Sequence, residues 1–218
     1  MLRSIMTLTV LSVLSALSVP LTAQSNGWTP LFNGKDLTGW QHVGPGEIVV
    51  DSGVMMTKGG MGLLWYGPRK FGNAVIRVVY KTKDKQSNSG VFIRVPVEPT
   101  EPWMPVYRGY EVQIDDNDDD WHATGSLYSL TKVAARPGKP GEWNTMEITL
   151  NGPRTTVQVN GVQITDYTEG QATPPKKFWY EPDRNPGRPN EGFIGLQNHK
   201  EKDVVWFKEI SVKELRRP

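Results

Sequence analysis

Carboxylate and amide side chains alternate with apolar ones between Gly109 and Asp115 (GYEVQID). Successive side chains of a β-strand point to opposite faces, so this alternation predicts a strand with one apolar and one polar face. Glu111, Gln113 and Asp115 share the polar face. Two carboxylates around a carboxamide could form the floor of a polar cleft that contains an acid or a base. An ordinary solvated face is the alternative.

Two further predicted strands place polar residues opposite an aliphatic face. In residues 192–199 (GFIGLQNH), Gln197 and His199 share the polar face, and in residues 90–94 (GVFIR), Arg94 does. If the three strands are neighbours in one sheet, all these polar side chains converge on a single site.

The spacing of Glu111 and Asp115 argues against an ordinary glycosidase pair. Four residues along a flat strand span ~13 Å. Retaining glycosidases need carboxyl groups about 5–5.5 Å apart, and inverting ones about 6.5–9.5 Å. Partners on neighbouring strands are about 5 Å apart. We therefore expect Glu111 to act with His199 or Arg94 rather than with Asp115.

The acidic run Asp115–Asp120 (DDNDDD) has the oxygen ligands that hard cations prefer, but Trp121 and His122 follow where an EF-hand needs Gly and Glu. The three histidines lack the spacing of zinc ligands. We predict a solvated turn here and no cofactor. A divalent cation is conceivable, but the ligand spacing does not support it.

Composition narrows the class of protein. The 218 residues carry a net charge of +2 with scattered basic residues, which argues against nucleic acid as a partner. Without cysteine, disulfides, thiol catalysis and cysteine-ligated zinc are excluded.

Frequent glycine and proline separate short apolar runs, which predicts an all-β sandwich. The expected strands are Ile48–Val50, Val54–Met56, Gly62–Tyr66, Ala74–Lys81, Ser89–Val95, Tyr110–Asp115, Gly125–Leu130, Asn144–Asn151, Thr155–Val159, Val162–Asp166, Gly192–Asn198 and Val204–Leu215.

Two long proline-rich segments interrupt this rhythm, Pro96–Arg108 and Tyr167–Glu191. Long strandless loops in compact domains are usually functional or disordered. Their aromatic and arginine content favours cleft walls. Tryptophans in irregular polar segments can stack on sugar faces, and the candidates are Trp103, Trp121 and Trp179.

The first 23 residues have the pattern of a secretory signal peptide. A short segment with Arg3 precedes an apolar stretch, and Ala23 ends a candidate cleavage site. The apolar stretch is shorter than the ~20 residues of a membrane helix; an N-terminal anchor is the alternative. We therefore expect an exported protein, periplasmic or secreted, with no membrane span after signal removal and one domain over residues 28–216.

Several motifs resemble the 3-keto-disaccharide hydrolase domain family. They are LFNGKDLTGW (residues 31–40), NSGVFIR (88–94), GYEVQID (109–115), TGSLY (124–128), GEWN (141–144) and GLQNH (195–199), which recur in the family's order. One departure from the family pattern is Ser129, at a position where members often carry glycine. The resemblance covers about Trp28 to Leu215. It implies a concanavalin-like jelly roll of two antiparallel sheets, with Leu31 and Val212 within the sheets, a cleft on the concave face, and an exported protein that acts on oxidised glycosides.

For a 3-keto glycoside, we expect removal of the C2 proton followed by loss of the C1 leaving group. Glu111 is the predicted base, with His199 as the alternate. Arg94, helped by Gln113, would hold the enolate oxygen, and His199 or Asp115 would protonate the leaving group.

Further substrate contacts are predicted from Gln197, Trp103, Tyr128 and Trp179. Two alternatives stay open: an ordinary glycoside hydrolase and a non-catalytic carbohydrate-binding module. The predicted partner is a carbohydrate in every case.

Overall fold

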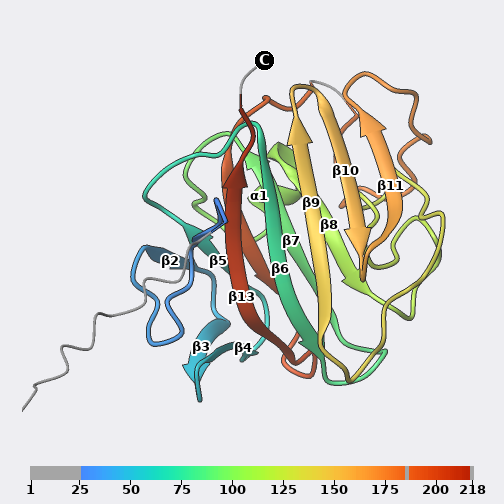
Figure 1. Ribbon diagram of the computed structural model, residues 1–218. Helices are drawn as coiled ribbons and strands as arrows, with labels where there is room; N and C mark the ends of the chain where they lie inside the picture. The colour runs from blue at the N-terminus through green and yellow to red at the C-terminus, as the bar shows by residue number, and fades with distance from the viewer. Residues whose placement is uncertain (1–25, 185–186, 217–218) are drawn as a thin grey trace, which may run out of the picture.

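The computed structural model describes residues 26–184 and 187–216, so the predicted signal segment, residues 1–23, lies outside the described residues. Two antiparallel sheets stack face to face (Figure 1). The elements are β1 (Thr29–Pro30), β2 (Trp40–Val43), β3 (Glu47–Asp51), β4 (Val54–Lys58), β5 (Gly62–Tyr66), β6 (Ala74–Thr82), β7 (Asn88–Val95), α1 (Met104–Arg108), β8 (Tyr110–Asp115), β9 (Asn144–Asn151), β10 (Arg154–Val159), β11 (Val162–Thr168), β12 (Phe193–Asn198) and β13 (Val205–Glu214).

The larger sheet has the strand order β11-β10-β9-β6-β13-β4-β3, with β1 also paired to β13. The smaller sheet has the order β2-β5-β12-β7-β8. This architecture confirms the predicted jelly-roll sandwich of two antiparallel sheets. Thr29 pairs with Val212, so the first and last strands lie side by side within the larger sheet, as expected.

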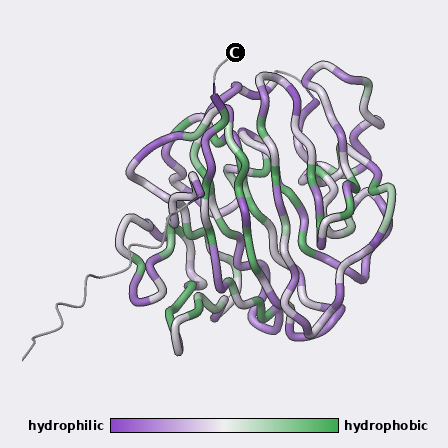
Figure 2. The backbone as a smooth tube through the Cα atoms, in the orientation of Figure 1, coloured by the Kyte–Doolittle hydropathy of each residue, from purple (hydrophilic) through white to green (hydrophobic). Residues whose placement is uncertain are grey.

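The main core lies between the sheets. Ile76, Val78 and Ile148 of the larger sheet pack in one cluster with Val91 and Val112 of the smaller one. Hydrophobic residues follow the strands at the centre, whereas hydrophilic residues gather in the connecting loops (Figure 2). Burying one such aliphatic side chain contributes about 1.5–3 kcal/mol, and with no cysteine in the chain this core carries the stability.

A second, smaller apolar cluster lies on the outer face of the smaller sheet. It contains Leu63, Trp65, Phe92, Val95 and Phe193, and α1 packs on it through Met104 and Val106. Among the described residues, no helix is long and apolar enough to cross a membrane.

The turn chemistry follows the sequence. Asn160 and Gly161 both have positive φ, +51° and +80°, and join Val159 to Val162 in a two-residue hairpin. This is the requirement of a type I′ turn, which Asn-Gly meets at little cost.

The structure differs from the expected elements in four places. The predicted strand Gly125–Leu130 is wrong: only Leu127 makes a bridge, because positive φ values at Gly125 (+87°) and Ser129 (+60°) prevent an extended chain. β1 and β2 were not predicted. Helix α1 was not predicted either, because five residues are too few to show helical periodicity.

Candidate active site

A cavity of about 590 Å³ opens on the outer face of the smaller sheet. Eight of the nine predicted site residues line it, namely Glu111, Gln113, Asp115, Gln197, His199, Trp103, Tyr128 and Trp179. The structure thus brings together side chains from positions 103 to 199, and their roles stay predictions.

These residues converge because β12, β7 and β8 are consecutive strands of the smaller sheet. All six residues of β8 are buried, on both of its faces. Its polar face is therefore the floor of a cavity rather than a solvated outer surface. The apolar face, with Val112 and Ile114, packs in the main core.

Glu111 is the most deeply buried carboxyl group of this floor, with 5% of its surface exposed. The side-chain nitrogen of Gln113, oriented toward its two acceptors, donates to Glu111 Oε1 and to the Ser89 carbonyl, each at 3.1 Å. Burial raises the pKa of Glu111 to about 8, against a smaller opposing effect of its hydrogen bond with Gln197. Within the described part of the chain, Glu111 forms no ion pair. A carboxyl group in this setting keeps its proton at neutral pH.

The room for this carboxyl group comes from Gly90 on the neighbouring strand. A Cβ atom at Gly90 would lie 2.4 Å from Glu111 Oε1 and 2.8 Å from its Cγ. We expect Gly90→Ala to lower turnover and to cost about 1–3 kcal/mol of folding stability, because the carboxyl group must leave its place. Gly72→Ala is the matched control, since its Cβ would meet only ordinary contacts of 3.6 Å and longer. Denaturant unfolding and turnover measure both effects, and a Gly90→Ala variant as active and stable as Gly72→Ala contradicts this packing.

His199 directly follows β12, and its side chain is hydrogen-bonded to that of Asp203. Its Nδ1 is 2.7 Å from Asp203 Oδ2, and only 4% of the Asp203 side chain is exposed. The backbone N–H of Asp203 donates to the Lys200 carbonyl at 3.0 Å, which closes the turn that carries the carboxylate. Imidazoles oriented by a carboxylate in this way serve as acid–base groups in enzymes.

Asp115 lies at the far end of β8 with its carboxylate already engaged. It accepts hydrogen bonds from Asn88 Nδ2 and from the Asn117 N–H, both at 2.8 Å. Burial raises its pKa. The pairing of β7 with β8 runs from Asp115 to Tyr110 without a register shift. With no bulge between them, the Cα atoms of Glu111 and Asp115 are ~13 Å apart along the strand. The residue opposite Glu111 on β7 is Phe92, and the residue opposite Asp115 is Asn88.

Arg94 is the one predicted site residue that the structure does not place in the cavity. Two residues of β7, Ile93 and Arg94, oppose the single residue Ile194 of β12, and Arg94 has φ +53°. This bulge ends the alternation, so Val95 takes the outward position that the sequence pattern gave to Arg94. The prediction that Arg94 holds the enolate oxygen is therefore wrong.

Arg94 is instead buried, with 2% of the residue exposed, and its guanidinium is hydrogen-bonded to two loops. It donates to the carbonyls of Pro189, Gly152 and Arg154 at 3.0, 2.7 and 3.3 Å, and to Asn190 Oδ1 at 3.2 Å. Burial lowers the pKa of Arg94. Its role is to join the β9–β10 turn to the loop that precedes β12.

Two segments form the walls of the cavity, as predicted. Trp103 and Tyr107 come from α1 and its N-terminal flank, and Trp179 and Tyr180 come from the loop between β11 and β12. The buried Arg188 connects the two walls.

Arg188 donates to the carbonyl of Tyr107 in α1 at 3.2 Å and to that of Gly109 directly after α1 at 3.0 Å. It also donates to the Asp183 carbonyl in the loop at 2.7 Å. Trp121 does not belong to these walls; it lines a separate small cavity of about 70 Å³.

One group among the described residues could hold a metal ion: Asp118, Asp119 and His122, with ligand atoms within 4.8 Å of one another. His122 Nδ1 and Asp119 Oδ1 already form a hydrogen bond of 2.8 Å. Asp118 alone of the three lines the cavity.

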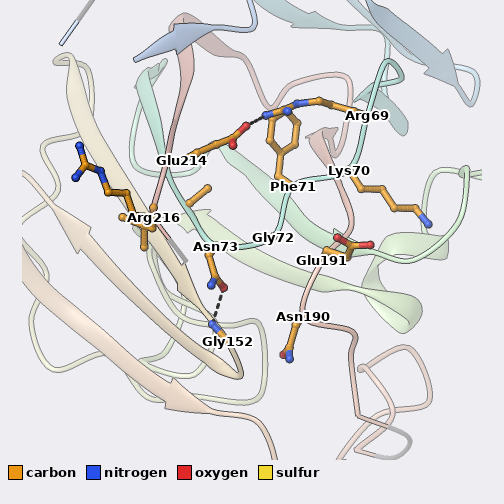
Figure 3. Close-up of a pocket in the computed structure, with 12 residues that line it drawn as sticks. Arg69, Lys70, Phe71, Gly72, Asn73, Gly152, Asn190, Glu191, Glu214 and Arg216 are labelled. Carbon is orange, nitrogen blue, oxygen red and sulfur yellow. Dashed lines mark hydrogen bonds and ion pairs between the residues drawn. The ribbon is translucent and has the colours of Figure 1, made fainter. Parts of the chain in front are cut away.

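A larger hollow of about 770 Å³ lies at another part of the molecule, where β6 begins and β13 ends (Figure 3). Its lining contains the exposed ion pair of Arg69 and Glu214, and the Asn73 side chain that accepts from the Gly152 N–H. It has no buried acid or base of the kind found on the floor of the first cavity, among the residues that line it. We therefore take the first cavity as the candidate active site.

Several residues of the site were missed from the sequence. Asn88, Tyr107 and Tyr180 line the cavity, and Asp203 supports His199 from outside it. Tyr107 and Tyr180 lie in the two segments that were predicted as walls. Asp203 gave no usable signal, because it ends the charged run HKEKD, which has the composition of a solvated turn.

Comparison with known proteins adds to this geometry. A curated protein of Bacteroides thetaiotaomicron named 3-keto-disaccharide hydrolase is 26% identical over 240 residues, which cover 91% of this chain and 82% of that protein. A crystal structure of a candidate glycosyl hydrolase from Parabacteroides distasonis aligns with a TM-score of 0.69 and 27% identity, over 86% of this chain and 99% of the other. A Bacillus subtilis protein described as having a galectin-like fold aligns with a TM-score of 0.61 and 13% identity, over 87% and 96%, and supports the fold alone.

The family model described as the 3-keto-alpha-glucoside-1,2-lyase-like domain matches residues 27–213, nearly the whole described chain. This match includes every residue that lines the cavity. The chain therefore belongs to the 3-keto-alpha-glucoside-1,2-lyase-like domain family.

Proposed function

We propose that this protein cleaves the glycosidic bond of glycosides whose C3 hydroxyl has been oxidised to a ketone. The ketone acidifies the proton on C2, and the glycosidic oxygen on C1 is β to the ketone. Removal of the C2 proton gives an enolate, and its collapse expels the glycosidic oxygen. Water then adds to the resulting unsaturated ketone. The reaction needs a base, an acid and a donor for the enolate oxygen.

The observation that carries the proposal is the composition of the cavity floor. It combines one buried carboxyl group, Glu111, with a histidine, His199, that a buried carboxylate orients. Asp115, the other carboxylate of β8, lies ~13 Å along the strand from Glu111. A carboxyl group and a histidine on one cavity floor supply the acid and the base that proton removal from carbon needs.

The enolate oxygen needs a donor other than Arg94. Tyr128 lines the cavity, and its backbone N–H donates to the Glu111 carbonyl at 2.9 Å. Burial, followed by the nearby Glu111 charge, raises the pKa of Tyr128, so its phenol keeps its proton and can donate. We assign this role to Tyr128, with the Gln113 carboxamide as its neighbour on the floor.

The relatives support the substrate class. The name of the Bacteroides protein specifies a 3-keto-disaccharide, and the family description specifies a 3-keto-alpha-glucoside. The secretory pattern of residues 1–23 further leads us to propose that the reaction takes place outside the cytoplasm.

A side-by-side assay tests the proposal. A glucoside and its 3-keto counterpart are offered at equal concentration, and we expect turnover of the 3-keto sugar alone, because only the ketone acidifies C2. Equal turnover of both sugars indicates an ordinary glycoside hydrolase. Binding of both sugars without any product indicates a carbohydrate-binding module.

A further inference from the structure

We propose that His199, positioned by Asp203, is the base that removes the C2 proton, and that Glu111 is the acid that protonates the leaving oxygen. This assignment reverses the roles expected from the sequence pattern and rests on the proposed function. It also makes Asp203, which lies outside the cavity lining, a positioning residue for the reaction.

The hydrogen bond of His199 fixes which nitrogen can act. Asp203 can only accept at its carboxylate, so the 2.7 Å contact requires the proton of the imidazole to lie on Nδ1. Nε2 is then left with a lone pair, and His199 lines the cavity. The Asp203 carboxylate also stabilises the imidazolium that forms when Nε2 takes a proton, as in other carboxylate–histidine pairs.

The surroundings of Glu111 favour its protonated form. Within the described residues no cation pairs with it, and the guanidinium of Arg94 is turned away to four other acceptors. Burial raises the pKa of Glu111, and this effect is larger than the opposing effect of its hydrogen bond with Gln197.

The proton transfers balance without any co-reactant. His199 Nε2 takes the C2 proton, and the electron pair of the C2–H bond forms the enolate of the C3 ketone. As the ketone re-forms, a C1–C2 double bond appears, the C1–O bond breaks, and Glu111 gives its proton to the departing oxygen. Water addition runs the same steps in reverse: the Glu111 carboxylate takes a proton from the water that attacks C1, and His199 returns its proton to C2.

Proton exchange in D₂O separates the two roles. The substrates are the 3-keto forms of a disaccharide and of a 4-nitrophenyl glucoside. Deuterium at C2 of the recovered substrate reports base action, and product release reports cleavage. For Glu111→Gln, we expect continued C2 exchange with a loss of ~10²–10⁴-fold in disaccharide cleavage, the usual size of a general-acid effect. Cleavage of the nitrophenyl substrate should fall by less than about tenfold, because that leaving group needs little protonation.

For His199→Gln, we expect loss of C2 exchange and of cleavage with both substrates. His42→Gln, an exposed histidine of β2 that does not line the cavity, is the control. Loss of exchange in Glu111→Gln together with its retention in His199→Gln overturns the assignment. If the wild-type protein neither exchanges the C2 proton nor cleaves 3-keto sugars, the proposed function itself is wrong. The wild-type measurement therefore separates failure of the proposed function from failure of the acid–base assignment.

Asp203→Asn tests the positioning role. We expect a fall of ~10²–10⁴-fold in both C2 exchange and kcat, with KM little changed, because the imidazole loses its orientation and the charge that stabilises its protonated form. Asp166→Asn is the control, since it removes a carboxylate from an exposed ion pair, with Arg154, that does not line the cavity. Unchanged exchange in a folded Asp203→Asn variant overturns the positioning role.

Discussion

Glu111→Gln should make the folded protein more stable at pH 8 while it removes most of the turnover. Turnover should fall by ~10²–10⁴-fold because the acid–base group is gone. Stability should rise because the folded state holds Glu111 with a pKa of about 8, above the ordinary value of 4.5. Between these two pH values the unfolded chain has lost a proton that the folded chain keeps. Folding stability therefore falls as pH rises, by about 1.4 kcal/mol per pH unit for this group.

Glutamine cannot titrate, so the difference in stability between Glu111→Gln and wild type should widen from pH 5 to pH 8 and level off above that. Burial raises the pKa values of Asp115 and Asp116 in both proteins, and their contributions cancel in this difference. Denaturant unfolding at several pH values measures it. Glu98→Gln, an exposed site, should show a constant difference near zero. A Glu111→Gln variant that is less stable than wild type at pH 8 would show that the carboxylate has a structural role instead.

Arg94→Met should destabilise the fold by about 2–4 kcal/mol and leave the chemistry of the cavity intact. Each buried acceptor that loses its donor costs about 1–3 kcal/mol, and Arg94 serves three carbonyls and one amide oxygen. Burial removes water from the charged guanidinium, as the lowered pKa of Arg94 shows, and this desolvation costs folding free energy. Methionine does not carry that cost, which offsets part of the loss.

Unfolding by urea and turnover at low temperature, where the variant remains folded, measure the two effects of Arg94→Met. Arg69→Met is the control: Arg69 is a half-exposed arginine whose surface ion pair with Glu214 contributes about 0–1 kcal/mol. Arg94→Lys should recover little stability, because an ammonium cannot reach four acceptors arranged around a planar guanidinium. A large loss of turnover in folded Arg94→Met would return Arg94 to the active site.

The regular parts of the site were predictable from sequence, because strand periodicity sets the direction of each side chain. Glu111, Gln113 and Asp115 lie on one face of β8 because its pairing with β7 has no irregularity. The same rule failed for Arg94, because one extra residue at a bulge reverses the direction of the side chain and no sequence pattern marked the bulge. The strand pattern does not determine that β12, β7 and β8 are neighbours; the sheet topology does.

Tertiary contacts determined what the sequence pattern left open. The family motifs predicted the jelly roll, whereas the elevated pKa of Glu111 depends on burial that arises only when the walls cover the floor. The protonation states, and hence the roles of acid and base, follow from these contacts. Ser129 illustrates the same limit: its φ of +60° is a conformation that glycine adopts more readily, but the sequence does not reveal the dihedral angle.

The last two strands of the chain occupy central positions in the two sheets. β12 lies between β5 and β7. β13 lies between β6 and β4, beside β6 in Figure 1, and also pairs with β1. A nascent chain that ends before residue 193 therefore has two divided half-sheets with unpaired strand edges, which are sites of aggregation. Neither sheet can be completed until β12 and β13 have been synthesised, so the domain cannot finish folding before residue 214 emerges. For the same reason, a nonsense mutation upstream of β13 should yield no folded product.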